Sequence, residues 1–288
     1  MTPGENDASR RKEKRKPGNP LGRKSIRHPE TGTRLSALEI HENIRAPAIE
    51  ELERPISSLF FSSLAAGMLI GFSFLSMGFV THYAPEPYRH PLASLAYPIG
   101  FMFVIMGRSE LFTENTLEPV IPLLHERDAK TLRQLLRMWA ILIVGNLLGA
   151  LVFGWLLGRT TMIDPSLHPS LQDLSRQATE GGFGDVFYKA IFGGWLIALL
   201  AWLLASTVDS IAQLFLIWVT TAPISAFHFR HSIAGSVEAF YRVAVGSAGW
   251  GEMLSGFVVP ALLGNAVGGV LLVALFNYAQ VAEEHEEH

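Results

Sequence analysis

Two long apolar stretches of this chain are each interrupted by a short polar segment, and each interruption is followed by a Gly-Asn pair. Phe112 lies 33 residues before Gly145, and His231 lies 33 residues before Gly264. The two polar segments are 108–115 and 228–232. Duplicated halves, each with an interrupted membrane helix, place non-helical backbone and polar groups at mid-membrane in transport proteins. The spacing therefore predicts a transport protein built from two related halves.

Apolar runs long enough to cross a bilayer recur throughout the chain after its polar first 56 residues. A helix of about 20 apolar residues spans a hydrocarbon core of about 30 Å. Six segments fit, at about 57–81, 93–122, 136–158, 187–207, 210–246 and 251–279. The second and fifth contain the polar interruptions and are too long for simple spans. The predicted fold is an all-α membrane protein of six transmembrane helices, an inverted repeat with broken second and fifth helices.

Basic residues are distributed unevenly between the two sides of these predicted spans. They cluster between Arg10 and Arg27 in the N-terminal tail and again between Arg127 and Arg137, after the second span. The hairpin after the first span carries only Arg89. Because positive charge collects on the cytoplasmic side, we expect a multi-pass protein of the cell inner (cytoplasmic) membrane with both termini cytoplasmic.

The chain divides into four segments by composition. Residues 1–34 are a basic tail predicted to be disordered, 35–55 an amphipathic cytoplasmic helix that Pro47 would kink or divide, 56–280 the transport domain, and 281–288 an acidic tail. The basic tail either contacts anionic membrane lipid headgroups or is simply solvated. It has no interleaved aromatic residues, so nucleic acid is not an expected partner.

Nothing in the chain predicts an enzyme. There is no cysteine, and we find no metal-ligand cluster, nucleophile arrangement or phosphate-binding glycine loop. No cofactor is expected. No cleavable signal peptide is expected either, because the first apolar segment begins near Leu59.

Irregular backbone survives at membrane depth only where it is buried in protein or lines a cavity, so the two breaks are predicted to face each other. The first supplies Leu111, Phe112 and Thr113. The second supplies His231, which can exchange a proton near neutral pH; alternatively, His231 only hydrogen-bonds a neighbouring helix. Arg230 stays charged and faces either the pathway, where it attracts anions, or the headgroups or a subunit interface.

Four other polar residues near the breaks are predicted to act in the architecture. Asn146 and Asn265 recur at matching positions beside the glycines and are expected to hydrogen-bond between helices. Glu110 and Glu114 are expected to pair with backbone amides or with Arg108.

The chain resembles the formate/nitrite transporter family over roughly residues 40–280. The motifs that carry the resemblance are Glu110-Leu111-Phe112-Thr113, Gly145-Asn146-Leu147-Leu148-Gly149, His231-Ser232-Ile233-Ala234 and Gly264-Asn265. The resemblance implies an aquaporin-like protomer and a homopentamer with one pathway through each protomer. It also implies small monovalent anions as substrates, such as formate, nitrite, hydrosulfide, lactate or acetate.

Roles for individual residues follow from the resemblance by position. Leu111, Phe112 and Phe101 would form the cytoplasmic constriction. Tyr97 and Ile224 would form the periplasmic constriction, where the family usually has phenylalanine. Thr113 and His231 would be the polar pair between the two.

The chain departs from the family pattern at four positions. Arg230 stands where the family commonly has glutamate before the histidine, and Gly235 where it has asparagine four residues after. Ala198 replaces an asparagine usual on the fourth span, and the lysine usual near the entrance of that span has no match between Gly181 and Val186. These changes remove hydrogen-bond donors and alter the charge of the pathway.

We therefore expect a channel or transporter for small weak-acid anions. A bare charge is heavily penalised in an apolar constriction, so a proton delivered through His231 would let the neutral acid cross, or a charged imidazolium would stabilise the anion. Two alternatives stay open. One is a non-transporting sensor or scaffold of the same fold, and the other is a channel for small neutral solutes.

Overall fold

The computed structural model of this chain describes residues 34–274, 276 and 279–280. The predicted disordered tail and the acidic tail therefore lie outside the described residues, except for Arg34. Within the described part the fold is all-α, with no strand. Three helical segments are long and apolar enough to cross a membrane, Ile56–Tyr83, Ala129–Arg159 and Phe183–Leu204, and a shorter apolar helix covers Ser210–Ala226.

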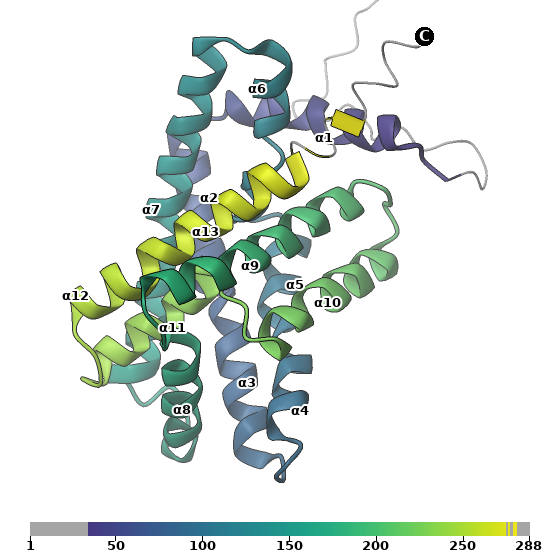
Figure 1. The fold of residues 1–288 in the computed structure, drawn as a ribbon. Helices are drawn as coiled ribbons and strands as arrows, with labels where there is room; N and C mark the ends of the chain where they lie inside the picture. Colours follow the sequence, from purple (N-terminus) through teal and green to yellow (C-terminus); the bar gives the residue numbers. More distant parts are fainter. Residues whose placement is uncertain (1–33, 275, 277–278, 281–288) are drawn as a thin grey trace, which may run out of the picture.

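The first helix, α1 (Ala37–Leu52), is one continuous helix although it contains Pro47. A capping box begins it: the hydroxyl of Ser36 accepts from the amide of Glu39, while the Glu39 carboxylate accepts from the amide of Ser36. One face, at helical spacing, is buried and holds His41, Ile44, Ala48 and Leu52. The α1 helix lies across one end of the molecule, beside α6 (Val120–Glu126) (Figure 1).

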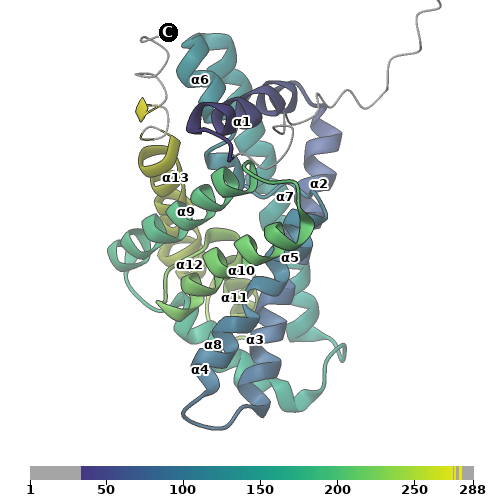
Figure 2. The same ribbon diagram turned by 90° about the vertical axis from the view of Figure 1, so that its right-hand side faces the viewer.

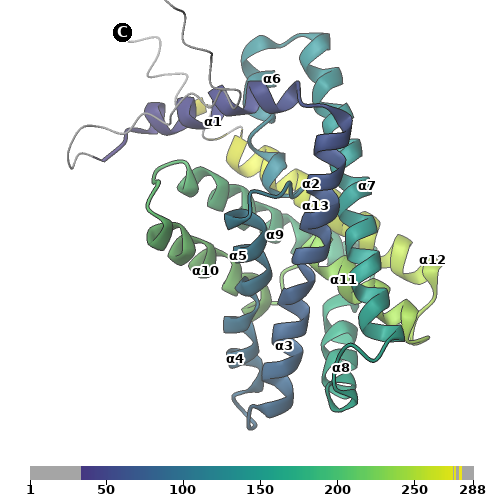
Figure 3. The same ribbon diagram turned by 180° about the vertical axis from the view of Figure 1, so that it is seen from behind.

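The helices of the first half are α2 (Ile56–Leu69), α3 (Gly71–Tyr83), α4 (Arg89–Ala96), α5 (Pro98–Met106), the 3-10 turn η1 (Glu114–Thr116), α6 and α7 (Ala129–Arg159). The helices η2 (Pro165–Leu167) and α8 (His168–Thr179) follow. The end of the molecule opposite α1 is formed by α3, α4 and α8 (Figure 3). We call these two ends the α1 end and the α8 end.

The second half contains α9 (Phe183–Leu204), α10 (Ser210–Ala226), α11 (Ser232–Ala244), α12 (Trp250–Met253), the π-helix η3 (Leu254–Val258), α13 (Val259–Gly269) and the π-helix η4 (Val270–Ala274). Helices α9 and α10 cross the middle of the molecule, between the α1 end and the α8 end (Figure 2). The α11 helix packs against α7 and α8, and its own residues are buried on every face of the helix.

Two tight helix pairs repeat between the halves: α2 packs against α7, and α9 packs against α13. Glycine makes both approaches possible, because there is no room for a side chain. A Cβ at Gly67 would lie 2.1 Å from the carbonyl oxygen of Asn146, and one at Gly194 would lie 2.2 Å from that of Asn265. Close backbone contact of this kind is how membrane helices pack without a hydrophobic driving force.

Each half also contains a segment where the helix stops and non-helical backbone follows. The α5 helix ends at Met106, and residues 107–113 are irregular before η1 begins. The α10 helix ends at Ala226, and residues 227–231 are irregular before α11 begins. Arg108 and His228, in the turns that leave the two helices, adopt left-handed backbone conformations with φ of 57° and 54°.

Candidate functional site

The side chains of Asn146 and Asn265 hold the two non-helical segments in place. The Asn146 oxygen accepts from the amide of Phe112 at 2.8 Å, and its nitrogen donates to the carbonyls of Ser63 at 2.7 Å and Glu110 at 2.9 Å. Both asparagines are fully buried and use both ends of the amide. The predicted architectural role is confirmed for Asn146.

The same three bonds recur in the second half. The Asn265 oxygen accepts from the amide of Ser232 at 2.7 Å, and its nitrogen donates to the carbonyls of Ala190 at 2.7 Å and Arg230 at 2.9 Å. Buried backbone polar groups need partners, and here each asparagine supplies them where the helix cannot. The predicted architectural role holds for Asn265 as well.

These bonds correct the residue match between the two halves by one position. The equal spacing of 33 residues pairs Phe112 with His231, but the amide bound by the asparagine belongs to Phe112 in one half and to Ser232 in the other. His231 is therefore the structural counterpart of Leu111. The physical reason is that the chain between bound amide and asparagine is one residue longer in the first half, where η1 and α6 intervene.

His231 is the N-cap residue of α11, and its ring is held on both sides. Its Nδ1 accepts from the amide of Ala234 at 3.1 Å, and its Nε2 lies 2.8 Å from the hydroxyl oxygen of Thr113. Because Nδ1 is an acceptor, the neutral ring carries its hydrogen on Nε2 and donates to Thr113. His231 and Thr113 are 2% and 0% exposed, so this hydrogen bond joins the two breaks inside the protein.

A chain of three contacting rings begins at His231 and ends at Tyr97. The ring of Phe101 meets that of His231 edge-on at a centroid distance of 5.0 Å, and the ring of Tyr97 lies 5.2 Å from that of Phe101. All three side chains are buried. Four of the predicted pathway residues, Tyr97, Phe101, Thr113 and His231, therefore form one continuous line of contacts.

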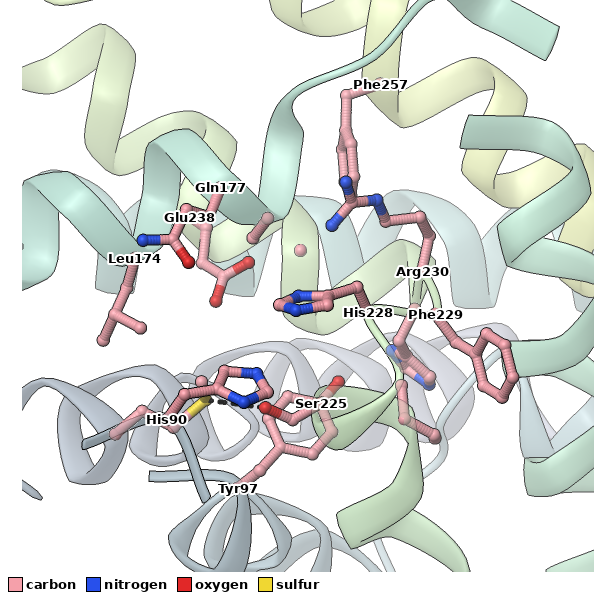
Figure 4. A pocket seen from close by; sticks show the side chains of 15 residues that line it. His90, Tyr97, Leu174, Gln177, Ser225, His228, Phe229, Arg230, Glu238 and Phe257 are labelled. Atoms are coloured by element: carbon pink, nitrogen blue, oxygen red, sulfur yellow. Dashed lines mark hydrogen bonds between the residues drawn. The ribbon is translucent and has the colours of Figure 1, made fainter. Parts of the chain in front are cut away.

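A cavity of about 50 Å³ lies beside both ends of this chain of rings, Tyr97 and His231. Such a volume holds about one small anion or a few water molecules. We call it the Arg230 cavity. Its lining residues are Met77, His90, Tyr97, Leu174, Gln177, Ala178, Ile224, Ser225, His228, Phe229, Arg230, His231, Gly235, Glu238 and Phe257 (Figure 4).

Of the predicted residues, Tyr97, Ile224, Arg230 and His231 line the Arg230 cavity. Arg230 is 5% exposed, and its Nη2 donates to the carbonyl of Glu180 at 2.9 Å. Its guanidinium points into the same space as the side chains of His228 and Glu238 (Figure 4).

Glu238 is a lining residue that the sequence analysis missed. It follows His231 by seven residues, two helical turns along the same face of α11. That spacing is the signal that would have found it, because a carboxyl group on the histidine-bearing face of a buried helix is rarely without purpose.

Leu111 and Phe112 are also buried, and neither lines the Arg230 cavity. The ring of Phe112 meets that of Trp139 on α7 edge-on at 5.7 Å. The Trp139 indole nitrogen donates to the carbonyl of Asn115 at 2.9 Å, so the aromatic packing around Phe112 is itself fastened to the break.

The Glu110 carboxylate pairs neither with Arg108 nor with a backbone amide, the two partners predicted for it. Its carboxylate instead accepts from Arg54, at the corner between α1 and α2, at 2.5 Å, and from the Asn115 side chain at 3.0 Å. Arg54 also contacts Glu51 on α1 at 3.3 Å. Burial of Glu51, together with the nearby charge of Glu110, raises the pKa of Glu51 to about 7. The first break is thus tied to the end of α1.

The departure at Gly235 has a structural explanation. A Cβ at this position would lie 2.2 Å from the ring of Phe257, which belongs to the π-helix η3. The Phe257 ring therefore occupies the space into which an asparagine at position 235 would extend.

Comparison with known proteins supports the resemblance seen in the motifs. The model of a family described as formate/nitrite transporter matches residues 38–279. The inner membrane protein YfdC of Escherichia coli is 32% identical over 249 residues, covering 86% of this chain and 80% of the relative. A probable formate transporter of Methanothermobacter thermautotrophicus is 28% identical, covering 82% of this chain and 94% of the relative.

Solved structures with a similar fold include a pentameric formate channel with formate bound. Its TM-score is 0.65 at 21% identity, and the match covers 79% of this chain and 98% of that one. An ion channel described as belonging to the same family gives a TM-score of 0.64 at 22% identity. The family match covers most of the described helices, and the similarity to YfdC covers 86% of the chain. The chain therefore belongs to the formate/nitrite transporter family, whose members are multi-pass membrane transporters and channels rather than enzymes.

Proposed function

We propose that this protein conducts small monovalent anions of weak acids, such as formate or nitrite, across the membrane together with a proton. The observation that carries the proposal is the hydrogen bond between Thr113 and His231, which joins the two breaks beside the Arg230 cavity. A relative from Bacillus thuringiensis, 24% identical, is described as a formate channel, which supports this substrate class.

The proposed architecture has six membrane crossings, with broken second and fifth helices arranged as an inverted repeat. The matching asparagine bonds in the two halves support it. We propose a homopentamer with a pathway in each protomer, on the strength of the similar fold of a pentameric channel. Both termini are proposed to be cytoplasmic, which makes the α1 end cytoplasmic and α1 an amphipathic helix at that surface in contact with lipid.

In this proposal the pathway has an apolar constriction on each side of the polar pair. Leu111, Phe112 and Phe101 form the one nearer α1, and Tyr97 and Ile224 form the other. Arg230 attracts the anion into its cavity, where the burial of the guanidinium strengthens the attraction.

The physical reason for a proton is the cost of charge. Moving an isolated carboxylate into an apolar medium costs tens of kcal/mol in the idealised limit, so the anion crosses the rings as its neutral acid. In the buried part of the pathway, the Nε2–H of His231 and the hydroxyl of Thr113 supply hydrogen bonds to the substrate in place of those it made with water.

The test is uptake into liposomes containing the purified protein, measured for formate, nitrite, hydrosulfide, acetate and lactate across a range of pH. His231→Phe keeps a ring that packs against Phe101 but removes the hydrogen bond to Thr113. We expect it to assemble and to lose uptake of every weak acid. His82→Phe, at a position outside the Arg230 cavity, is the matched control and should transport like the wild type. Undiminished uptake by His231→Phe would remove this histidine from the mechanism.

Two further measurements separate the alternatives. Neutral solutes of similar size are included in the uptake panel, and their passage at rates equal to those of the acids would favour a neutral-solute channel. Deletion of residues 1–34 should leave transport intact, whereas a scaffold that uses this tail would lose its cellular role while showing no transport at all.

A further inference from the structure

Glu238 is a buried carboxyl group that faces the Arg230 cavity with no protein partner among the described residues. The residue is 5% exposed and lines the cavity. No described side chain or backbone group donates a hydrogen bond to it, and no described cation lies within ion-pair distance; Arg230 acts on it only through its longer-range charge. An ionisable side chain at membrane depth is a functional candidate by default, and its lack of a protein partner requires an explanation.

A structural ion pair within α11 does not provide that explanation. Arg242 follows Glu238 by four residues, the spacing at which a helix pairs opposite charges. Its guanidinium instead donates to the hydroxyl of Thr179 at 2.8 Å and lies 3.7 Å from the carboxylate of Glu252. Arg230 is likewise bound elsewhere, to the carbonyl of Glu180.

The groups around Glu238 can bind and neutralise an anion. The titratable and charged residues that line the cavity with it are His90, Tyr97, His228, Arg230 and His231. Helices α3 and α8 and the π-helix η3 contribute uncharged residues to the lining. His90 and His228 stack at a centroid distance of 4.6 Å. Arg230 is the permanent positive charge of the cavity.

His231 is poorly placed to supply the proton itself. Its Nδ1 is occupied by the amide of Ala234, and its Nε2–H is already donated to Thr113. Taking up a second proton would break the cap of α11. Giving up the Nε2 hydrogen would leave an imidazolate. The proton therefore comes from another group on the cavity.

We propose that Glu238 is the proton donor of the Arg230 cavity, an inference that rests on the transport function proposed above. An anion A⁻ enters and is held by the Arg230 guanidinium. The O–H bond of the Glu238 carboxyl breaks as an O–H bond forms on the anion, which leaves the neutral acid and a Glu238 carboxylate beside Arg230. The acid moves from the cavity to His231, which lines it, and to Thr113, and then passes Phe101, while a proton from the solution at the α8 end restores Glu238.

This step defines the substrate class. The anion must be basic enough to accept a proton from a carboxylic acid, as the conjugate bases of weak acids are. Anions of strong acids, such as chloride or nitrate, bind at Arg230 but stay charged and are stopped by the apolar rings.

The experiment compares Glu238→Gln with the wild type reconstituted in liposomes, using formate as the probe and a pH dye inside the vesicles. Glutamine keeps the size and polarity of the side chain but has no proton to transfer. We expect formate uptake to fall by roughly tenfold or more, as for loss of a general acid, and to lose its acceleration at low external pH. Glu238→Asp should restore part of both.

Glu252→Gln is the matched control, because the Glu252 side chain is 58% exposed and lies outside the cavity. It should retain the uptake rate and pH profile of the wild type. Wild-type uptake should also acidify the vesicle interior, with one proton released for each formate taken up. Chloride should neither be taken up nor acidify the interior. This measurement needs no variant and tests the inference even if Glu238→Gln fails to assemble.

The outcomes separate the two proposals. A wild-type protein that takes up none of the weak acids refutes the transport function. If the wild type takes up formate, two results overturn the role of Glu238. One is a Glu238→Gln variant with unchanged rate and pH profile, and the other is wild-type uptake without acidification.

Discussion

Replacing Asn265 with alanine tests whether this residue holds the second break in place or contacts the substrate. The substitution removes three hydrogen bonds and leaves the amide of Ser232 and the carbonyls of Ala190 and Arg230 without their partner. All of these groups lie at a fully buried side chain. If the role of Asn265 is to hold the backbone of the second break, this one substitution should cause a large loss of stability.

The magnitude can be bounded from the three bonds. Hydrogen bonds between membrane helices average about 0.6 kcal/mol, which gives roughly 2 kcal/mol for the set. A buried group left unsatisfied costs about 1–3 kcal/mol, which raises the sum. We therefore expect a loss of about 2–4 kcal/mol.

The assay is reversible unfolding in mixed detergent micelles, followed by tryptophan fluorescence. Asn43→Ala is the control: this asparagine makes one hydrogen bond, to the carbonyl of Ala205 at 3.2 Å, and its loss should cost less than about 1 kcal/mol. Uptake of formate is measured on the same samples.

Two results would refute the reasoning. If Asn265→Ala is no less stable than Asn43→Ala, the three bonds do not hold the break. If Asn265→Ala keeps its stability but loses uptake, the residue acts on the substrate rather than on the backbone.

Two further predictions concern the ends and the packing of the molecule. The pKa of Glu51 is raised to about 7, so the stability that its neutral form contributes is present at low pH and lost as pH rises through about 7. Because the loss begins above the unfolded pKa of 4.5, Glu51→Gln should leave the stability unchanged at about pH 4 and raise it by roughly 1 kcal/mol at about pH 8; an equal effect at both pH values would contradict this. Gly194→Ala places a Cβ 2.2 Å from the carbonyl oxygen of Asn265 and should destabilise by about 1–3 kcal/mol. Gly251→Ala, with nothing within 4 Å, should not, and equal melting temperatures for the two variants would show that α9 and α13 can separate without cost.

The non-helical segments 107–113 and 227–231 fall at the polar interruptions of the sequence, and the two asparagines hydrogen-bond as predicted, because both features leave a pattern along the chain. Polar residues inside an apolar run and a repeated Gly-Asn pair are visible without a structure. The amphipathic face of α1 was visible for the same reason, although Pro47 proved compatible with one continuous helix.

Other features depend on contacts that no local pattern encodes. The match between the halves was wrong by one residue because the length of the segment between break and asparagine differs, and equal spacing to the glycine hid this. The pairing of Glu110 with Arg54 joins residues far apart in the chain. Glu238 was overlooked although its spacing of seven residues from His231 is visible in the sequence, because nothing local shows that this face of α11 lines a cavity.

The asparagine bonds also determine how the two halves are able to move. Asn146 fastens the first break to α2 and α7, and Asn265 fastens the second break to α9 and α13, so each break travels with its own half. Among the described residues of the breaks themselves, one polar contact crosses between the halves, from His231 to Thr113. A movement of one half against the other would preserve the six asparagine bonds, but it would have to break this hydrogen bond, the bond from Trp218 to the carbonyl of Leu95 and the packing of α11 on α7. Each break is thus clamped to its own half, and the hydrogen bond that joins the two breaks lies on the proposed route of the substrate.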